Sequence, residues 1–274
     1  MPIGHVPQVE STFAYLDGSY GILNDQHLAI GESTCASVLV NFPVYAGGMA
    51  LFDMSALTRI AMERCASARC AIKTMGYFAQ QYGFYGAEWT GEFAQSEAGE
   101  ALSIADKQEV WIFHVSPDGS NASAVWVAQR VNDLHVAAVT NDFIIREVNV
   151  SDTNTFLASD NLFEVAQAHG LWKAGEIFDF ARVFSPAVRP VQLSYYMRRR
   201  WRVYSLVSGL EFDPWADYAQ HPLPFSVPAK SLLTVADLKS YNRDYFQNTS
   251  FDLSKGLAAG PYGDPNRYDK PGAY

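Results

Sequence analysis

The alternation of apolar and polar residues divides the N-terminal third of the chain into short strands and one long helix. β-Branched and aromatic residues fill 12–16 and 27–39, and turn-forming Asp, Gly and Asn residues separate these two segments, which is typical of short strands. Apolar residues then recur every three or four positions from 55 to 81, which predicts an amphipathic helix. Asp53 or Ser55 can cap the start of this helix, and Gly83 can end it.

The segment 101–150 has the pattern of an antiparallel meander. Its four apolar runs, separated by turns, are 101–105, 110–115, 124–129 and 134–140. Because several runs are apolar at consecutive positions, we expect both faces of the sheet to be covered. The 55–81 helix would cover one face and a second sheet the other. Two further helices are predicted at 160–169 and 173–184, and the remainder reads as loops.

Residues 33–52 carry no charge and have about the length that crosses a bilayer. Asn41, Pro43 and the pair Gly47-Gly48 interrupt this stretch, and proline would break a helix there. We therefore predict a buried strand that runs into a loop, and no membrane partner.

Composition and charge narrow the class of protein. Hydrophobic residues make up 49% of the 274 residues and charged residues 18%, so a large core is available. The chain has 20 basic and 29 acidic residues and a net charge of −9, which opposes binding to a phosphate backbone or to an anionic membrane surface. We expect no nucleic-acid partner. The first residues show no secretory signal pattern, and the compartment stays open.

The three cysteines show neither zinc spacing nor a disulfide framework, so we expect no metal and no cofactor. Cys65 and Cys70 lie on or near the apolar side of the predicted helix, where packing explains both. Cys35 follows three polar residues and is a candidate nucleophile, but the apolar run after it predicts a buried, protonated thiol. His114 and His135 lie within predicted strands and read as ordinary core or surface histidines.

A dense basic cluster spans 198–202. It has two interpretations that the residues alone do not separate. The cluster is either a solvated face of a strand or helix, or a clamp for a substrate carboxylate.

Several blocks together resemble the dipeptidase A and secernin family of cysteine peptidases. The blocks that carry the resemblance are 20–35 (YGILNDQHLAIGESTC), 83–89 (GFYGAEW), 97–102 (EAGEAL), 126–130 (WVAQR), 141–148 and 256–267 (GLAAGPYGDPNR). The resemblance implies an N-terminal-nucleophile hydrolase of the α+β class, with a four-layer αββα sandwich. It also implies that 1–274 is a single hydrolase domain, truncated at both ends relative to the family.

In this family the mature chain begins with the catalytic cysteine, whose α-amine acts as the base for its own thiol. The present chain begins with Met1-Pro2, so the cysteine block would lie before Met1, and the family continues past Tyr274. We therefore expect the chain as given to be inactive.

The resemblance also implies roles for residues that are present. Asn141 of the pair Thr140-Asn141 would help to hold the oxyanion, although Phe143-Ile144 stands where the wider clan has a proline. Arg199 would steady charge in the site. Glu32, Ser33, Thr34 and Arg202 would bind substrate.

Three functions follow from these observations. The first is a thiol-dependent dipeptidase that acts on small peptides. The alternative is a catalytically inactive, secernin-like or degenerate protein that acts through binding. A third uses the secondary amine of Pro2 as base or nucleophile. A homo-oligomer is left open.

Overall fold

The computed structural model describes residues 3–186, 190–218, 220–260 and 263–264, so Pro2 and residues 261–262 and 265–267 of the block 256–267 lie outside the described part. The chain divides into two compact units. Unit 1 comprises Met1–Asp133 and Asn141–Pro186, and unit 2 comprises Leu134–Thr140 and Ala187–Tyr274. Helices and a large antiparallel sheet make the protein α+β, as predicted.

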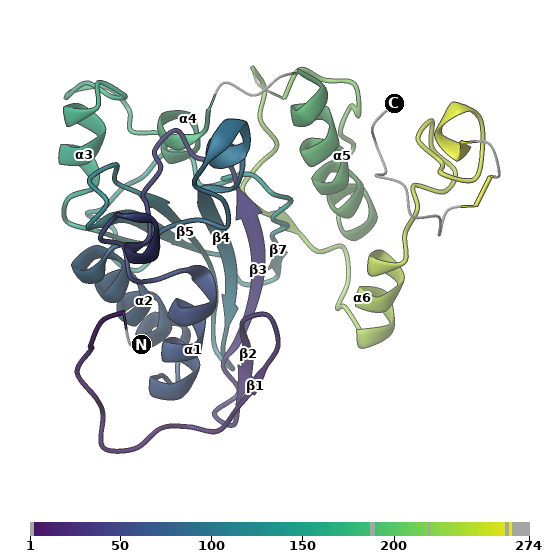
Figure 1. Cartoon of the computed structure of the whole chain (residues 1–274). Helices are drawn as coiled ribbons and strands as arrows, with labels where there is room; N and C mark the ends of the chain where they lie inside the picture. Colours follow the sequence, from purple (N-terminus) through teal and green to yellow (C-terminus); the bar gives the residue numbers. More distant parts are fainter. Residues whose placement is uncertain (1–2, 187–189, 219, 261–262, 265–274) are drawn as a thin grey trace. The chain divides into compact units, whose positions relative to one another are not determined.

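Unit 1 is built on a seven-stranded antiparallel sheet with the order β1-β2-β3-β4-β5-β6-β8 (Figure 1). The strands are β1 (Tyr15–Asp17), β2 (Gly21–Asn24), β3 (Ala29–Cys35), β4 (Gly99–Ala105), β5 (Val110–Pro117), β6 (Ala124–Arg130) and β8 (Phe156–Ala158). The first three runs of the predicted meander are confirmed as β4, β5 and β6.

The predicted fourth strand of the meander is wrong. Of 134–140, only His135–Val136 (β7) is a strand, and it pairs with Val227–Pro228 (β9) in a two-stranded sheet of unit 2. The edge of β6 is taken instead by β8, which pairs with Val127, Ala128 and Gln129. Because an edge accepts one neighbour, the apolar run that follows β6 in the sequence cannot also pair there.

The predicted 55–81 helix is two helices, α1 (Met54–Arg64) and α2 (Ala68–Tyr82). Asp53 caps α1, and Gly83 ends α2 with a positive φ of 77°. The break comes from a second cap. Ser67 has extended backbone angles, and its hydroxyl accepts a hydrogen bond from the backbone N–H of Cys70, which starts a new helix.

The break also joins two cysteines that we expected to be packed separately. Cys65 and Cys70 form a disulfide, with their Cα atoms 5.4 Å apart. In a continuous helix, residues five apart would point about 140° away from each other. Both residues pack in or against the core, as predicted, but the expectation that the cysteines form no disulfide is wrong, because the helix break turns these two side chains toward one another.

The two helices lie side by side against one face of the sheet (Figure 1). There, α2 contacts β4, β5 and β6, and α1 contacts β1 and β2. Buried residues of the helices and the sheet form one core, whose largest members include Leu57, Met62, Ile72, Met75, Phe84, Leu102, Trp111 and Phe113. The predicted cover of one sheet face by this region is confirmed.

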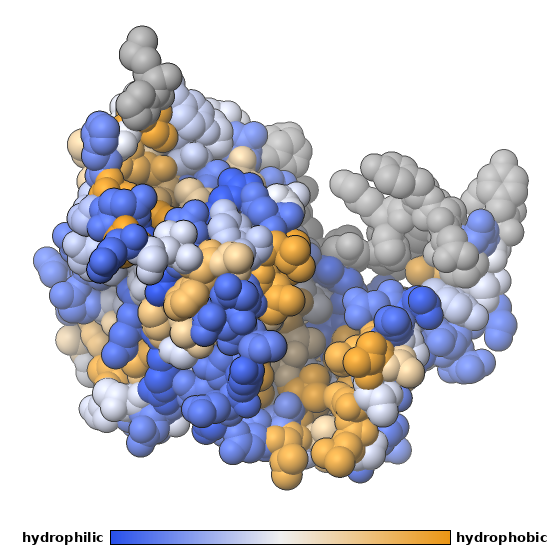
Figure 2. Space-filling model, turned by 90° about the horizontal axis from the view of Figure 1, so that it is seen from below, coloured by the Kyte–Doolittle hydropathy of each residue, from blue (hydrophilic) through white to orange (hydrophobic). Residues whose placement is uncertain are grey.

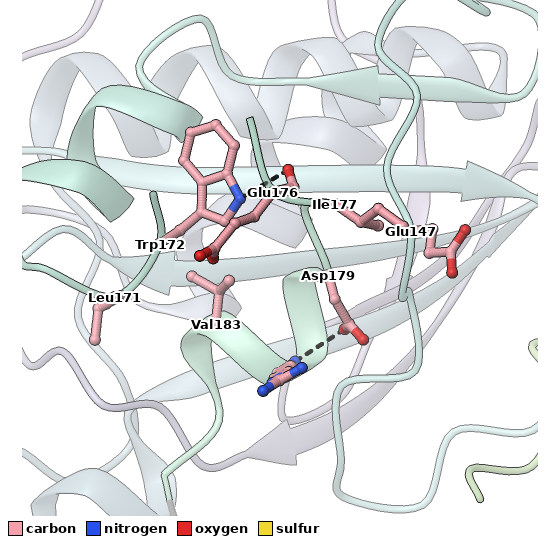
Figure 3. A pocket seen from close by; sticks show the side chains of 8 residues that line it. Glu147, Leu171, Trp172, Glu176, Ile177, Asp179 and Val183 are labelled. Atoms are coloured by element: carbon pink, nitrogen blue, oxygen red, sulfur yellow. Dashed lines mark hydrogen bonds between the residues drawn. The ribbon is translucent and has the colours of Figure 1, made fainter. Parts of the chain in front are cut away.

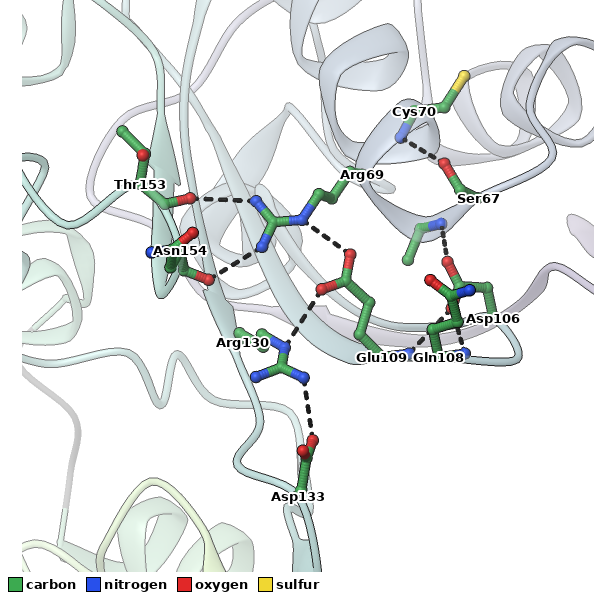
Figure 4. A network of polar contacts seen from close by, with 11 residues as sticks. Ser67, Arg69, Cys70, Asp106, Gln108, Glu109, Arg130, Asp133, Thr153 and Asn154 are labelled. Atoms are coloured by element: carbon green, nitrogen blue, oxygen red, sulfur yellow. Dashed lines mark hydrogen bonds and ion pairs between the residues drawn. The ribbon is translucent and has the colours of Figure 1, made fainter.

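A network of charged groups joins the start of α2 to the strands (Figure 4). Arg69 Nε and Arg130 Nε lie 2.8 and 3.2 Å from the two oxygens of Glu109. The Arg69 guanidinium also donates to the carbonyl oxygens of Thr153 and Asn154, each at 3.0 Å. Because Glu109 lies in the turn before β5 and Arg130 ends β6, the network holds three elements in register.

After the sheet, unit 1 contains fewer helical residues than predicted, whereas unit 2 contains more helical residues than predicted. In place of 160–169 and 173–184, the structure has α3 (Leu162–Ala168) and α4 (Phe180–Phe184). Unit 2 contains α5 (Pro190–Val207) and α6 (Val235–Asn242), which the apolar pattern did not indicate. Short 3-10 helices are η1 (Val44–Ala46), η2 (Gly91–Glu97) and η3 (Leu257–Ala259).

The face of the molecule seen from below in Figure 2 carries many hydrophilic side chains and several patches of hydrophobic ones. Leu232, Val235 and Leu238, in and just before α6, are among the exposed apolar residues. Within the described part of the chain, no helix has both the length and the apolar content needed to cross a membrane. The charge-free stretch 33–52 is the end of β3 followed by loop and η1, as predicted.

The packing of α2 on β6 gives a prediction for Gly76. A Cβ at this position would lie 2.6 Å from Trp126 Nε1, closer than packed atoms come. Three atoms of the Trp126 indole lie within 2.7 Å of this Cβ, so the cost falls in the upper part of the overpacking range, about 2–3 kcal/mol. Since alanine gains about 1 kcal/mol over glycine in a helix, Gly76→Ala should lower the free energy of unfolding by about 1–2 kcal/mol. Urea unfolding would measure this change.

The matched control is Gly209→Ala, because a Cβ at Gly209 meets no atom within 4 Å. It should leave the free energy of unfolding almost unchanged. A Gly76→Ala protein as stable as the parent would contradict the close approach of α2 to β6.

Candidate functional site

The predicted substrate-binding residues 32–34 lie in the second half of β3, and they divide between the two faces of the sheet. β3 pairs with β4 in a continuous register that places Glu32 opposite Leu102, Ser33 opposite Ala101 and Thr34 opposite Glu100. Since side chains alternate along a strand, Glu32 and Thr34 share one face and Ser33 lies on the other. The three side chains therefore do not line a single surface.

Asn141 reaches the outer edge of β3. Its backbone N–H donates to Ser33 Oγ at 2.9 Å, and its Nδ2 donates to the carbonyl oxygen of Thr34 at 2.7 Å. The residue has a positive φ of 64°, a conformation that asparagine adopts more readily than most residues. The structure thus brings together Ser33, Thr34 and Asn141, three of the residues predicted for the site.

A tyrosine completes this edge. The backbone N–H of Glu32 donates to Tyr20 Oη at 3.3 Å. Glu32 N and Thr34 O therefore both point away from β4, because residues two apart along a strand direct their backbone groups to the same side. Side chains of Tyr20 and Asn141 occupy edge positions that a neighbouring strand would otherwise fill.

A carboxyl cluster lies on the Glu32 face of this strand. Thr34 Oγ1 donates to Glu32 Oε1 at 2.9 Å, and Glu100 lies directly across from Thr34 on β4. Glu100 is only 3% exposed. Burial, followed by the hydrogen bond and the charge of Glu32, raises the pKa of Glu100 well above its usual value of 4.5.

Sequence reasoning missed Glu100 as part of this cluster. The residue lies within the block 97–102 that supports the family resemblance, but no role was attached to it. One signal was available, because a glutamate at the start of an apolar strand is a buried polar residue that needs a partner. The identity of that partner depends on the register between β3 and β4.

The opposite face of the sheet is covered by the segment after Asn141 and by α4. His114 of β5 is fully buried, and its Nε2 accepts hydrogen bonds from the backbone N–H groups of Ile144 and Ile145, at 2.9 and 3.2 Å. The rings of Phe143 and Phe180 pack against the imidazole, with centroids at 5.0 and 5.8 Å. A ring nitrogen that accepts is not protonated, so His114 is a neutral core histidine, as predicted.

The second histidine, His135, lies in unit 2. Its Nδ1 is 3.0 Å from Ser226 Oγ beside the β7–β9 pair. This contact agrees with the prediction of an ordinary histidine.

Cys35 ends β3 and is fully buried. Its Sγ donates to the carbonyl oxygen of Ser33 at 3.3 Å. The prediction that apolar surroundings bury this thiol is confirmed. A thiol that is buried and donates a hydrogen bond is kept in its protonated form, which is a poor nucleophile.

The basic cluster 198–202 lies on α5 in unit 2. Successive residues of a helix are rotated by about 100°, so neighbouring arginines point in different directions. Arg198 stacks over the ring of Phe251, with its Cζ 3.9 Å from the centroid. The cluster is therefore neither a uniformly solvated face nor a set of parallel side chains.

The two arginines predicted for the site have partners within unit 2. Arg199 Nη2 donates to the carbonyl oxygen of Thr140 at 2.8 Å. Arg202 forms a two-point ion pair with Asp244, with both distances 2.8 Å. The guanidinium of Arg202 is thus engaged within the chain, and the roles of Arg199 in charge stabilisation and of Arg202 in substrate binding stay predictions.

A surface pocket of about 630 Å³ lies elsewhere in unit 1 (Figure 3). It is lined by Glu147, Leu171, Trp172, Glu176, Ile177, Asp179, Arg182 and Val183. Asp179 caps α4 and lies 2.8 Å from Arg146, and Trp172 Nε1 donates to the carbonyl oxygen of Glu176. None of the residues predicted for the site lines this pocket.

Metal ligation has no support in the arrangement of side chains. Across the described residues, no group of three or more His, Cys, Asp or Glu side chains is placed so that it could hold a metal ion. The chemistry available around β3 is that of hydroxyl, amide and carboxyl groups.

Comparison with known proteins identifies a family and a curated relative. The model of peptidase family C69 matches residues 20–271. Dipeptidase A of Lactobacillus helveticus is 23% identical over 226 residues, which cover 81% of this chain and 40% of that relative. The chain therefore spans about two fifths of the length of this curated relative.

The buried carboxyl group gives a prediction for stability against pH. A carboxyl whose pKa is higher in the folded than in the unfolded state stabilises the fold at low pH, and this stability is lost as pH rises through the raised pKa. The contribution of Glu100 to the free energy of unfolding should therefore fall, by at most about 1.4 kcal/mol per pH unit, as pH rises above about 4.5.

Glu100→Gln removes the ionisable group while keeping its size. The free energy of unfolding of the variant minus that of the parent, measured by urea denaturation at several pH values, should increase as pH rises above about 4.5. A constant difference between the two proteins from pH 4 to pH 8 would show that Glu100 titrates normally. Gln108→Glu, in the exposed turn before β5, is a control for adding a solvated carboxyl.

Proposed function

Because this chain belongs to peptidase family C69, as its sequence predicted, we propose that it is the central part of a dipeptidase-type cysteine peptidase. The similarity to a dipeptidase supports small peptides as the substrate class. In this proposal the nucleophile is a cysteine that lies outside the 274 residues, and no cofactor takes part.

The state of the three cysteines carries the proposal. Cys35 is buried and its Sγ donates to a backbone carbonyl, while Cys65 and Cys70 are joined in a disulfide. Thiol-dependent hydrolysis needs an accessible thiolate. Since none of the three cysteines offers one, a thiol peptidase built on this fold requires another cysteine.

Asn141 supplies the electrostatic part of the proposed mechanism. When a thiolate attacks a peptide carbonyl, negative charge develops on the carbonyl oxygen, and a preorganised N–H donor stabilises it. The two bonds from Asn141 to β3 fix the position of its amide. We assign the oxyanion role to Asn141 and charge stabilisation to Arg199. The substrate contacts proposed for Glu32, Ser33, Thr34 and Arg202 do not come from one face of β3, because Ser33 lies on the face opposite to Glu32 and Thr34.

The architecture belongs to the same proposal. The large sheet with α1 and α2 on one face supplies two layers. We propose that the whole enzyme is a four-layer αββα sandwich of the N-terminal-nucleophile type, and that residues 1–274 form part of a single hydrolase domain.

The lack of an accessible thiolate among the three cysteines also supports a second candidate function. A chain without an accessible thiolate can keep its fold and act through binding, as a catalytically inactive relative. The two candidates differ in one respect, which is whether an upstream cysteine restores hydrolysis.

A paired assay tests this difference. The 274-residue chain and a version extended upstream to the family's cysteine block are given small unblocked dipeptides, and hydrolysis is followed by release of amino acids. We expect thiol-dependent hydrolysis by the extended chain alone, because only it carries the nucleophile. Equal hydrolysis by both would contradict the missing nucleophile, and hydrolysis by neither would favour the binding protein.

Cys35→Ala in the extended chain is the control for the cysteine within β3. It should change kcat less than twofold, since the Cys35 thiol does not react. A loss of activity comparable to removal of the upstream cysteine would identify Cys35 as the nucleophile.

The extended chain also tests Asn141. Removal of one oxyanion donor costs about 10²–10³ in kcat, so Asn141→Ala should reduce kcat by that factor with a smaller effect on KM. Asn149→Ala, at an exposed position nearby in the sequence, is the matched control. An Asn141→Ala enzyme with normal kcat would remove Asn141 from the mechanism.

A further inference from the structure

The register between β3 and β4 places Glu100 opposite Thr34. Glu32 N and Thr34 O form hydrogen bonds with Tyr20 and Asn141, on the side away from β4. Thr34 and Glu100 are therefore a pair without mutual backbone bonds, and in such pairs the side chains come closest. Glu32, one position along the same face, is the diagonal neighbour of Glu100.

The groups around Glu100 do not suit a second negative charge. Glu100 is 3% exposed, and its Oε2 has no hydrogen-bond partner among the residues that the structure describes. The charged groups that act on it are Glu32 of β3 and Glu97 of η2, and both are carboxyl groups. The Thr34 hydroxyl favours the charged form of Glu100, but burial and Glu32 outweigh this effect. Across the sheet on β5, its partner is the apolar Val115.

A shared proton resolves this arrangement. Two carboxyl groups in contact cannot both be ionised at low cost, but one proton between them turns the contact into an O–H···O hydrogen bond. Glu32 is the more exposed of the two and accepts the Thr34 hydroxyl. Glu100, which is buried, holds the proton and donates it toward Glu32.

Thr34 connects this carboxyl pair to Asn141 by two hydrogen bonds. Thr34 donates its hydroxyl to Glu32 at 2.9 Å, and its carbonyl oxygen accepts from Asn141 Nδ2 at 2.7 Å. We propose that Glu100 is a positioning residue for the Asn141 amide and acts through a proton that it shares with Glu32. Deprotonation of Glu100 places a second negative charge beside Thr34 and displaces the strand end that holds Asn141.

The consequence for catalysis rests on the proposed function, because it assumes that Asn141 stabilises the oxyanion. The positioning itself does not depend on substrate or on the nucleophile. It is therefore tested on the 274-residue chain, so that failure of this inference and failure of the dipeptidase proposal are separate results.

The test is a pH titration of the ¹⁵N-labelled chain by NMR, following the side-chain amide of Asn141. The signal is assigned by its loss in Asn141→Ala. We expect it to shift with one midpoint well above pH 4.5, and we expect this transition to disappear in Glu100→Gln. Glu97→Gln should keep the transition, because Glu97 is not in the path to Asn141.

The chain offers an internal control in Asn41. This residue is buried, and its amide donates to the carbonyl oxygens of Phe84 and Ser123 and, at 3.3 Å, to Asp118 Oδ1, none of which belongs to β3 or β4. Its signal should show no transition with the Glu100 midpoint. A merely structural role for Glu100 would alter both amides in the variant without linking Asn141 to a titration.

A second measurement covers the case in which Glu100→Gln does not fold. With glutamate labelled at ¹³Cδ, one carboxyl signal of the parent should titrate well above pH 4.5, and Glu32→Gln should lower its midpoint. A parent in which the Asn141 amide does not move between pH 4.5 and pH 8 would overturn the proposal. So would a transition that persists in Glu100→Gln, or a carboxyl midpoint that is unchanged by Glu32→Gln.

Discussion

The outer edge of β3 between Glu32 and Thr34 is the constraint on which the candidate site depends. β2 pairs with β3 only at Ala29, so the backbone groups farther along need other partners. Unpaired backbone groups are costly when buried and promote unwanted strand pairing when exposed. Tyr20 and Asn141 meet this requirement with side chains, and Asn141 thereby becomes fixed against the strand.

This edge links positions that are more than one hundred residues apart in the sequence. The bond from Asn141 N to Ser33 Oγ and the bond from Asn141 Nδ2 to Thr34 O hold the chain at the point where it returns to unit 1. The residues that follow, Phe143 to Ile145, then cover His114 on β5. The hydrogen bonds of Asn141 to β3 and those of Ile144 and Ile145 to the His114 imidazole therefore determine the course of this segment.

The opposite face of β3 shows a different balance. Glu32 and Glu100 lie at the end of a face that is otherwise filled by the apolar core under α1 and α2. Apolar replacements of equal size would pack there without the cost of burying polar groups. Two carboxyl groups are nevertheless present beside the strand end that holds Asn141. We interpret this pair as part of a site whose geometry depends on charge.

The local pattern of residues was sufficient for the α+β class, the helical region at 55–81, and the strands β4, β5 and β6, because alternation and helical periodicity are properties of neighbouring residues. It also predicted the burial of Cys35 and the family. The pattern failed where distant groups compete. Ser67 caps a new helix and lets Cys65 bond to Cys70, β8 takes the edge expected for 134–140, and the arginines of α5 separate around a helix.

The site divides in the same way. The sequence was sufficient to propose Asn141 and residues 32–34 as site residues, from their types and from the family blocks. It was also sufficient to predict that Cys35 is buried and unreactive, because an apolar run follows it. The partners are not readable, because Glu100 meets Glu32, and Asn141 meets Thr34, only once the register of the sheet is set. The register of two strands depends on the interactions along their whole length and on which face of the sheet is buried. The residues near Glu100 or Asn141 in the sequence therefore do not indicate which distant residues will be their partners.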